Sequence, residues 1–268
     1  MKQILKQQTD LVGYAELELL SINQTHEYEK LWLCGGRQQS YSAKTIEESY
    51  VWRQRYILHV LERIIPNLGF HIPALRMWRL LTIIAHNQGK TLNCSQIGVS
   101  LGVTHHTTRH YIDVLAGTFM VRILEPWFEN ISKRQVKTPR VFIRDSGLLH
   151  SLLGIQNNDQ LQVYPRLGAS WEGFALEEVI KVNHAQPEEC YFWGVQGGAE
   201  LDLLILKNGK RIGFEIKYTD APKLTKSMVM ALQDLKLDHL YVVYPHPVSF
   251  PLADKVSAVG IEEIKSVF

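Results

Sequence analysis

The tightest constraint on the fold lies between residues 199 and 217, where two apolar runs are separated by Asn208-Gly209. Asn-Gly between two strand-like runs is typical of a two-residue β-hairpin, because both turn positions need a positive φ. A two-residue turn also determines which residues face each other across the hairpin. We therefore expect Lys207 to face Lys210, with regular pairing from there to the open end.

This register pairs four charged residues, with Asp202 opposite Glu215 and Glu200 opposite Lys217. Because side chains alternate across a strand, all four are expected on one face of the hairpin. Two carboxylates that face each other repel, and a hairpin optimised for stability avoids that pairing. A divalent cation or one shared proton would remove the repulsion. An aspartate followed by Glu-x-Lys across a hairpin is therefore more typical of a metal site than of a folding pattern.

A third carboxylate comes from the helix predicted over Ser170–Val182. At about 100° per residue, Glu172 falls in the middle of the apolar face, while Glu177 points away from it and Glu178 lies at its edge. A carboxylate in an apolar stripe is costly unless it is paired or coordinates something. Glu172 is therefore expected to point at the hairpin site. The alternative is a favourable interaction with the dipole at the helix N-terminus.

The rest of the C-terminal region alternates strands and helices, as in an α/β sandwich. The predicted elements are a strand at Glu189–Trp193, the hairpin, a helix from Asp220 or Pro222 to Lys236, a strand at Leu240–Tyr244 and a strand at Val256–Val259. Leu224, Met228 and Leu235 are expected to face inward from that helix. Lys223 and Lys226, near its start, could bind the phosphate backbone of a nucleic acid.

The N-terminal half is predicted to be mainly helical. The expected helices are Glu27–Trp32, Ser42–Ile65 stopped by Pro66, Pro73–Asn87 with Leu75, Trp78 and Leu81 on its buried face, a short helix ending at Gly102, and one capped by Thr104 that runs to Leu115. The last two, joined at a glycine turn, form a helix-turn-helix pattern. Strand-like runs at Phe119–Leu124 and Arg140–Arg144 would supply a β wing.

This winged-helix interpretation gives two groups of side chains that could contact nucleic acid. His105, His106, Thr108 and Arg109 are expected on the exposed side of the recognition helix, and Lys133, Arg134, Lys137 and Arg140 in or beside the wing. The alternative is a module that contacts protein or the neighbouring domain, because histidines are a weak source of charge at neutral pH.

Three regions are expected along the chain. Residues 160–268 form the α/β sandwich and residues 30–155 the helical and winged-helix domain, with a polar connector between Gly154 and Gly168. Residues 1–29 contain one strand-like run, Leu11–Leu20, and no neighbouring strand to pair with. That run is expected to be either the last strand of a sheet whose remainder is absent from this chain or a short arm that packs on the body.

Composition excludes several functional classes. A net charge of +2 on 268 residues requires any nucleic-acid contact to come from local patches. Cys34, Cys94 and Cys190 have neither metal-ligand spacing nor the even number of a disulfide framework, which fits a reducing cytoplasm. No apolar run approaches the ~18 residues of a membrane span, so we expect a cytoplasmic protein with no membrane contact.

No nucleotide-binding motif accompanies these elements. Gly89-Lys90-Thr91 is the only Gly-Lys-Thr, and Ile84 stands where the first glycine of a P-loop belongs. ATP hydrolysis by this chain alone is therefore not expected. The candidate site that remains consists of Asp202 and Glu215 as ligands of Mg²⁺ or Mn²⁺, Glu172 as an assisting carboxylate and Lys217 as a catalytic cation.

These residues resemble those of the PD-(D/E)XK nuclease superfamily. More closely, the chain from about Leu31 onward is similar to the domain of unknown function that follows the ATPase core in a bacterial and archaeal AAA+-like ATPase family. The similarity rests on Leu31–Gly36, Phe142–Leu149, Trp171–Glu178, Glu200–Asp202 and Glu215–Lys217, and Gly13–Leu17 resembles the last strand of that ATPase core. It covers nearly nine tenths of the chain.

The resemblance implies a winged helix followed by a restriction-endonuclease-like fold in a protein truncated or split from its ATPase core. The first functional hypothesis is a metal-dependent nuclease-like domain that binds and cleaves DNA. The second is a non-catalytic DNA- or protein-binding module. DNA, a separate ATPase core and a second copy of the chain are the expected partners.

Overall fold

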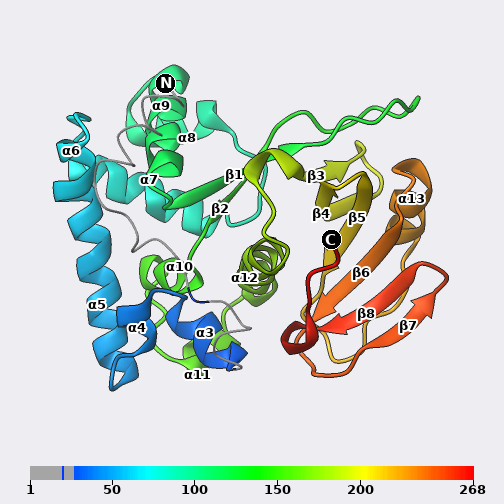
Figure 1. Ribbon diagram of the computed structural model, residues 1–268. Helices are drawn as coiled ribbons and strands as arrows, with labels where there is room; N and C mark the ends of the chain where they lie inside the picture. Colours follow the sequence, from blue (N-terminus) through cyan, green and yellow to red (C-terminus); the bar gives the residue numbers. More distant parts are fainter. Residues whose placement is uncertain (1–19, 21–26) are drawn as a thin grey trace. The chain divides into compact units, whose positions relative to one another are not determined.

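The computed structural model describes Leu20 and residues 27–268, which form two compact units of a mixed α/β protein (Figure 1). The first unit contains Leu20, Glu29–Ile123 and Val141–Leu167. The second contains residues 27–28, Leu124–Arg140 and Gly168–Phe268. The predicted strand at residues 11–20 lies outside the described residues, apart from Leu20.

Helices make up most of the first unit. They are α3 (Tyr28–Cys34), α4 (Gln38–Tyr41), α5 (Ile46–His59), the π-helical turn η2 (Val60–Ile64), α6 (Ile65–Asn67), α7 (Ala74–His86), α8 (Cys94–Leu101), α9 (His105–Gly117), α10 (Ser146–Leu152) and α11 (Asn158–Gln162). Pro66 was expected to end the long helix, but the helical path continues through η2 to Asn67. Pro66 lies in the first turn of α6, where a missing N–H is tolerated.

Local capping explains where several of these helices begin and end. The Thr104 hydroxyl accepts from Thr107 N at 3.1 Å at the start of α9, and Asp145 Oδ1 accepts from Leu148 N at 2.8 Å at the start of α10. Gly102 follows α8 with a φ of 66°, a conformation that favours glycine. The predicted pair of short helices joined at Gly102 is confirmed.

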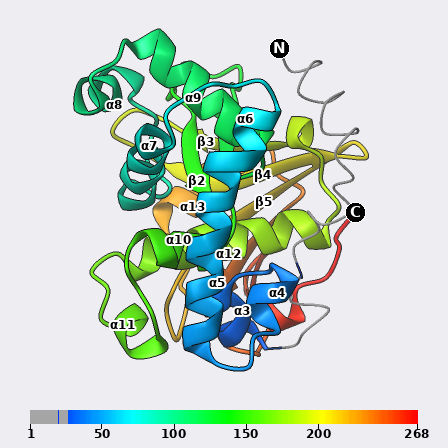
Figure 2. The same cartoon turned by 90° about the vertical axis from the view of Figure 1, so that its left-hand side faces the viewer.

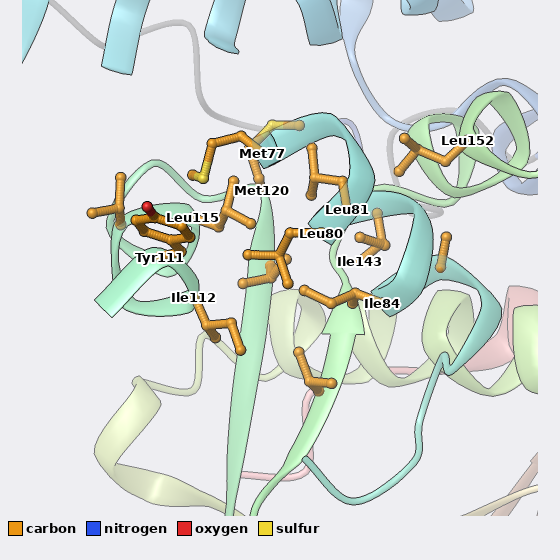
Figure 3. Packing of buried hydrophobic residues seen from close by; sticks show 14 of the residues in the cluster. Met77, Leu80, Leu81, Ile84, Tyr111, Ile112, Leu115, Met120, Ile143 and Leu152 are labelled. Carbon is orange, nitrogen blue, oxygen red and sulfur yellow. The ribbon is translucent and has the colours of Figure 1, made fainter. Parts of the chain in front are cut away.

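The buried face of α7 differs from the prediction. Leu81 is buried as predicted, but Leu75 is 65% exposed, and Met77, Leu80 and Ile84 form the rest of the buried face. Figure 3 shows these side chains beside residues of α9 and of the two strands that follow it. The helix is amphipathic, and Leu75 lies on its exposed side with Arg79 and His86, so the prediction centred the apolar face in the wrong place.

The exposed face of α9 also needs one correction. Thr108 is fully buried, with its hydroxyl donating to Thr104 O at 3.0 Å, whereas His105 and His106 are exposed as expected. A Cβ on Gly98 would lie 3.0 Å from Thr108 Oγ1, so α8 packs closely over this position. Thr108 is therefore part of the helix–helix contact.

The strands are β1 (Val121–Pro126), β2 (Arg140–Ile143), β3 (Cys190–Gly194), β4 (Glu200–Lys207), β5 (Lys210–Ile216), β6 (His239–Tyr244), β7 (Phe250–Ala253) and β8 (Val256–Gly260). In the first unit β2 lies next to β1. In the second unit the end of β1 starts a mixed sheet with the order β1-β3-β4-β5-β6-β8-β7. The prediction missed β7, a short edge strand that contains Pro251.

The second unit also contains two 3-10 turns, η3 (Pro187–Glu189) and η4 (Ile261–Glu263). Two helices cover the faces of its sheet (Figures 1 and 2). One helix is α12 (Leu167–Val182), and the other is α13 (Lys226–Asp234) on the opposite face. The α13 helix begins several residues later than predicted, because the Thr225 hydroxyl caps it by accepting from Met228 N. Leu224 therefore precedes the helix and is 41% exposed instead of facing inward.

The hairpin of β4 and β5 confirms the predicted turn and most of the predicted register. Asn208 and Gly209 have φ values of 51° and 75°, as a type I′ turn requires. Pairing runs from Lys207–Lys210 to Leu203–Phe214 as expected. It stops one step before Asp202.

A β-bulge explains this stop. Leu204 pairs with Tyr191 and Leu201 with Trp193, so three steps along β4 match two along β3. Leu201 and Leu204 consequently pack in the same cluster against α13, although residues three apart point to opposite faces in a regular strand. The predicted backbone pairing of Asp202 with Glu215 is therefore absent from the regular ladder, because a bulge interrupts it.

Candidate functional site

The second unit gathers six charged side chains at the open end of the β4–β5 hairpin. We call them the acid cluster: Glu172 from α12, Glu200 and Asp202 from β4, Glu215 from β5, Lys217 just beyond it, and Arg140 from the first residue of β2. All four residues of the predicted metal and catalytic set are members. Arg140 is the member that was predicted to lie elsewhere, in or beside the β wing.

Asp202 is the centre of the acid cluster and is buried. Its Oδ2 accepts a hydrogen bond from Ile216 N at 2.9 Å, in place of the backbone pairing that the bulge interrupts. Its Oδ1 lies 3.5 Å from Arg140 Nη1. Each carboxylate oxygen of Asp202 thus faces a donor.

Glu215 is buried beside Asp202. Its Oε1 forms an ion pair with Lys217 Nζ at 2.7 Å, while its buried Oε2 has no hydrogen-bond partner. Burial, followed by repulsion from Asp202, raises the pKa of Glu215 to about 7. Burial alone would lower the pKa of Lys217, but the Glu215 and Asp202 carboxylates outweigh it and raise the pKa above its usual value.

Glu172 approaches Asp202 from α12. Its side chain is 24% exposed, but its Oε1 is buried, makes no hydrogen bond and lies 3.5 Å from Arg140 Nη1. Burial and the Asp202 charge raise the pKa of Glu172 to about 8. Glu172 thus points at the hairpin site as predicted, whereas Glu177, which was expected to point away, is also buried.

Arg140 enters the acid cluster instead of extending from a wing. Its guanidinium forms an ion pair with Glu200 and lies 3.5 Å from both Glu172 Oε1 and Asp202 Oδ1. It also lies over the Phe192 ring, 4.8 Å from the ring centroid. The side chain is only 11% exposed, so its charge acts on the cluster and not on the surrounding solvent.

No group of three histidine, cysteine, aspartate or glutamate side chains in the described part of the chain is arranged to hold a metal ion. In the acid cluster, the cation that lies between carboxylates is Arg140. The carboxylates are nevertheless hard oxygen donors of the kind that Mg²⁺ and Mn²⁺ prefer.

The loop between β1 and β2 carries the basic residues that were predicted for the wing. It belongs to the second unit, where Gln135 pairs with Val195 and Val136 N donates to Gly194 O. Lys133 forms an ion pair with Asp234 at 2.6 Å, whereas Arg134 and Lys137 are exposed. Exposed Lys223 and Lys226, before and at the start of α13, lie in the same unit.

The other predicted nucleic-acid contacts lie in the first unit. Arg109 forms an ion pair with Asp113 at 3.0 Å within α9, and the His105 and His106 rings are 3.8 Å apart between centroids. The residues predicted to bind nucleic acid are therefore divided between the two units. His106 and Arg109 are in one, and Lys133, Arg134, Lys223 and Lys226 are in the other.

A different buried cluster occupies the first unit, and two of the motifs behind the family resemblance build it. We call it the Arg53 cluster: Arg53, Asp145, His150 and the backbone of Leu33–Gly36 and Gly147. Arg53 donates to Leu33 O, Gly147 O and Ser49 O at 3.0, 2.9 and 3.2 Å. Asp145 accepts from Gly36 N and Leu148 N, one at each of its carboxylate oxygens.

Two family models match this chain. One is a domain of unknown function, DUF8612, over residues 25–159, and the other is a domain of unknown function, DUF4143, over residues 167–264. The Arg53 cluster and Arg140 lie within the first match, and the carboxylates and Lys217 of the acid cluster lie within the second.

Two curated relatives are each 45% identical to the chain over 236 residues, which is 88% of the chain and 53% of the relative. They are the uncharacterized protein Rv2008c of Mycobacterium tuberculosis and the uncharacterized protein Mb2031c of Mycobacterium bovis. The chain thus spans about half the length of these relatives. No solved structure matches it. Among the residues that the structure describes, no helix is long and apolar enough to cross a membrane.

Proposed function

The chain belongs to the family of the domain of unknown function DUF8612, and we propose that its second unit is a nuclease-like module that binds DNA and cleaves its backbone with a divalent metal ion. The observation that carries this proposal is that the acid cluster has too few positive charges to balance its carboxylates. Four carboxylates against two cations leave 4 − 2 = 2 negative charges when every group is ionised.

Two protons or one divalent cation would balance this deficit. Glu172 and Glu215 have pKa values raised to about 8 and about 7, so they hold protons near neutral pH when no metal is bound. A stability-driven site would not bury carboxylates that ionise so reluctantly. A cation of charge +2 would instead allow all four carboxylates to ionise together.

The buried oxygens without hydrogen bonds also fit a metal. Glu215 Oε2 is such an atom, and Glu172 Oε1 is another. Asp202 and Glu215 would hold the ion, with Glu172 assisting from α12. When bound, Mg²⁺ or Mn²⁺ lowers the pKa of a coordinated water and stabilises negative charge on a phosphodiester.

The side chains of the chain itself would bind and orient the DNA. Lys217 is 42% exposed and held by Glu215, so its ammonium can reach a phosphate oxygen and stabilise charge that develops there. The exposed cations Arg134, Lys137, Lys223 and Lys226 would contact the backbone without reading sequence.

Plasmid cleavage tests this function. Supercoiled plasmid is incubated with the protein and Mg²⁺ or Mn²⁺, and nicked and linear forms are quantified on gels. We expect Asp202→Ala and Lys217→Ala to lower the cleavage rate at least ~100-fold. Lys265→Ala removes the same charge as Lys217→Ala at an exposed position of the same unit and should cleave normally. Unchanged plasmid in every condition rejects the enzymatic proposal.

A second candidate is a DNA- or protein-binding module without cleavage. It is favoured by Arg140, which already compensates carboxylates of the acid cluster in the metal-free protein. Its test is a gel shift across a range of salt concentrations, because each lost phosphate contact lowers the salt slope by about 0.9. Arg109→Ala and Arg134→Ala report on the first and second units separately. A salt-dependent shift without cleavage favours this candidate.

The helix-turn-helix of α8 and α9 supports a related proposal, a winged-helix element in the first unit. Gly102 joins the two helices, and β1 and β2 are neighbours in the sheet. The family resemblance further supports an ATPase core as partner. Co-purification with such a core, carried on the same or a separate polypeptide, tests that partnership.

A further inference from the structure

The position of Arg140 bears on how metal binding to the acid cluster is controlled. This inference rests on the proposed metal site. Arg140 Nη1 lies 3.5 Å from Asp202 Oδ1 and 3.5 Å from Glu172 Oε1, two of the three carboxylates that would contact the metal. Asp202 Oδ2 is already engaged by Ile216 N. A cation that binds Asp202 through Oδ1 must therefore compete with the guanidinium.

The inner contacts of Arg140 are also the weaker ones. At 3.5 Å they lie at the outer limit of a hydrogen bond. The close contact is with Glu200, whose side chain is 59% exposed. A guanidinium held tightly at the exposed end and loosely at the buried end can leave the buried carboxylates while it keeps its ion pair with Glu200.

We propose that Arg140 is a built-in counter-ion that occupies the carboxylate site of the metal-free protein and is displaced by the divalent cation. In the metal-free state the guanidinium lies between Glu172 and Asp202 and compensates negative charge there. When a cation of charge +2 enters, like-charge repulsion drives the guanidinium toward Glu200 and solvent. Arg140 thereby sets the metal concentration at which the site fills.

Calorimetric titration with Mn²⁺ measures this competition without any reading of activity. We expect Arg140→Gln to bind Mn²⁺ about tenfold more tightly than the unchanged protein, because the competitor and its repulsion are both removed. Arg134→Gln removes the same charge from an exposed position six residues earlier and should change the affinity less than about twofold.

The outcomes separate this inference from the proposed function. If Mn²⁺ binds the unchanged protein in a manner abolished by Asp202→Ala, and Arg140→Gln binds with the same affinity, the counter-ion role is rejected while the metal site stands. If Mn²⁺ binds neither the unchanged protein nor Arg140→Gln, both are rejected. Equal gains in Arg140→Gln and Arg134→Gln would reduce the effect to net charge and also reject the counter-ion role.

A measurement on the unchanged sequence keeps the test independent of variant folding. With ¹⁵N-labelled arginine, the side-chain signals of Arg140 are followed during titration with diamagnetic Mg²⁺. We expect them to shift and sharpen as the guanidinium leaves Asp202 and Glu172 and rotates more freely. Arg140 signals that stay unchanged at saturating Mg²⁺ contradict displacement.

Discussion

Each unit buries one group of charged side chains, and the two groups differ in how they are compensated. In the Arg53 cluster the opposite charges of Arg53 and Asp145 balance, and each makes at least two hydrogen bonds to the backbone, although Arg53 Nη2 is buried without a hydrogen-bond partner. In the acid cluster the carboxylates outnumber the cations, and Glu215 Oε2 has no hydrogen-bond partner.

This difference separates a structural group from a candidate functional one. Buried groups of opposite charge that balance and are anchored to the backbone stabilise a particular packing, and losing one partner is costly. Carboxylates held together with a net charge deficit raise one another's pKa values and leave room for a ligand of opposite charge. We therefore expect changes in the Arg53 cluster to lower stability, and changes in the acid cluster to alter ligand binding and pH dependence.

The largest expected effect is on the stability of the first unit. Arg53→Met removes a fully buried guanidinium, leaves three backbone carbonyls without their donor and removes a positive charge that interacts with Asp145. The free energy of unfolding should fall by about 4 kcal/mol. Arg55→Met, at an exposed position on the same helix, should change it by less than about 0.5 kcal/mol. Urea unfolding measures both, and equal midpoints for the two variants would contradict the comparison.

Close backbone packing in the Arg53 cluster gives the next effect. A Cβ on Gly147 would lie 2.1 Å from Cys34 O, a backbone atom that cannot move aside alone. Gly147→Ala should lower the free energy of unfolding by about 3 kcal/mol. At Gly168 an added Cβ meets nothing within 4 Å, so Gly168→Ala is the matched control and should unfold at the same or a higher temperature. Calorimetric melting temperatures compare the two.

The acid cluster should make the metal-free protein less stable at alkaline pH. Because the pKa of Glu215 rises from 4.5 to about 7 on folding, the folded state binds more protons than the unfolded state between these values. The free energy of unfolding therefore falls as pH rises through this window, by roughly 3 kcal/mol for Glu215. The melting temperature in EDTA between pH 4.5 and 9 measures this decline.

Glu215→Gln carries no titrating proton and should flatten that decline. At pH 9, Mg²⁺ should raise the melting temperature of the unchanged protein, because a cation replaces the lost proton. The same pH dependence in Glu215→Gln and in the unchanged protein would show that Glu215 is not strained in this way.

The smallest expected signal comes from His150 in the Arg53 cluster. Burial lowers its pKa to about 3, so its ring should stay neutral and its NMR shifts constant from pH 8 to 5. Here the unfolded state binds the proton first, and stability is lost as pH falls below about 6.5. The two residues therefore change stability with opposite signs, and their pH windows overlap between about 4.5 and 6.5. His150→Gln assigns the signal, and a titration midpoint near 6 would contradict the burial of a neutral ring.

Local patterns predicted much of the fold. The Asn208-Gly209 turn, the cap at Thr104 and the glycine at 102 each depend on residues within a few positions, and the structure confirms all three. The buried face of α7 was predicted less well. Met77 and Leu80 pack against α9 and the neighbouring strands, whereas Leu75 lies on the exposed side of the helix with Arg79 and His86.

The acid cluster shows the same division between what the sequence determined and what the tertiary structure decided. The types and spacing of Glu200, Asp202, Glu215 and Lys217, with Glu172 on a preceding helix, predicted five of its six members. The bulge at Asp202 and the arrival of Arg140, 62 residues earlier in the chain, depend on how distant strands pair. Hydrogen bonds between near neighbours are encoded in short patterns, whereas the counter-ion of a buried carboxylate is selected by packing across the whole unit.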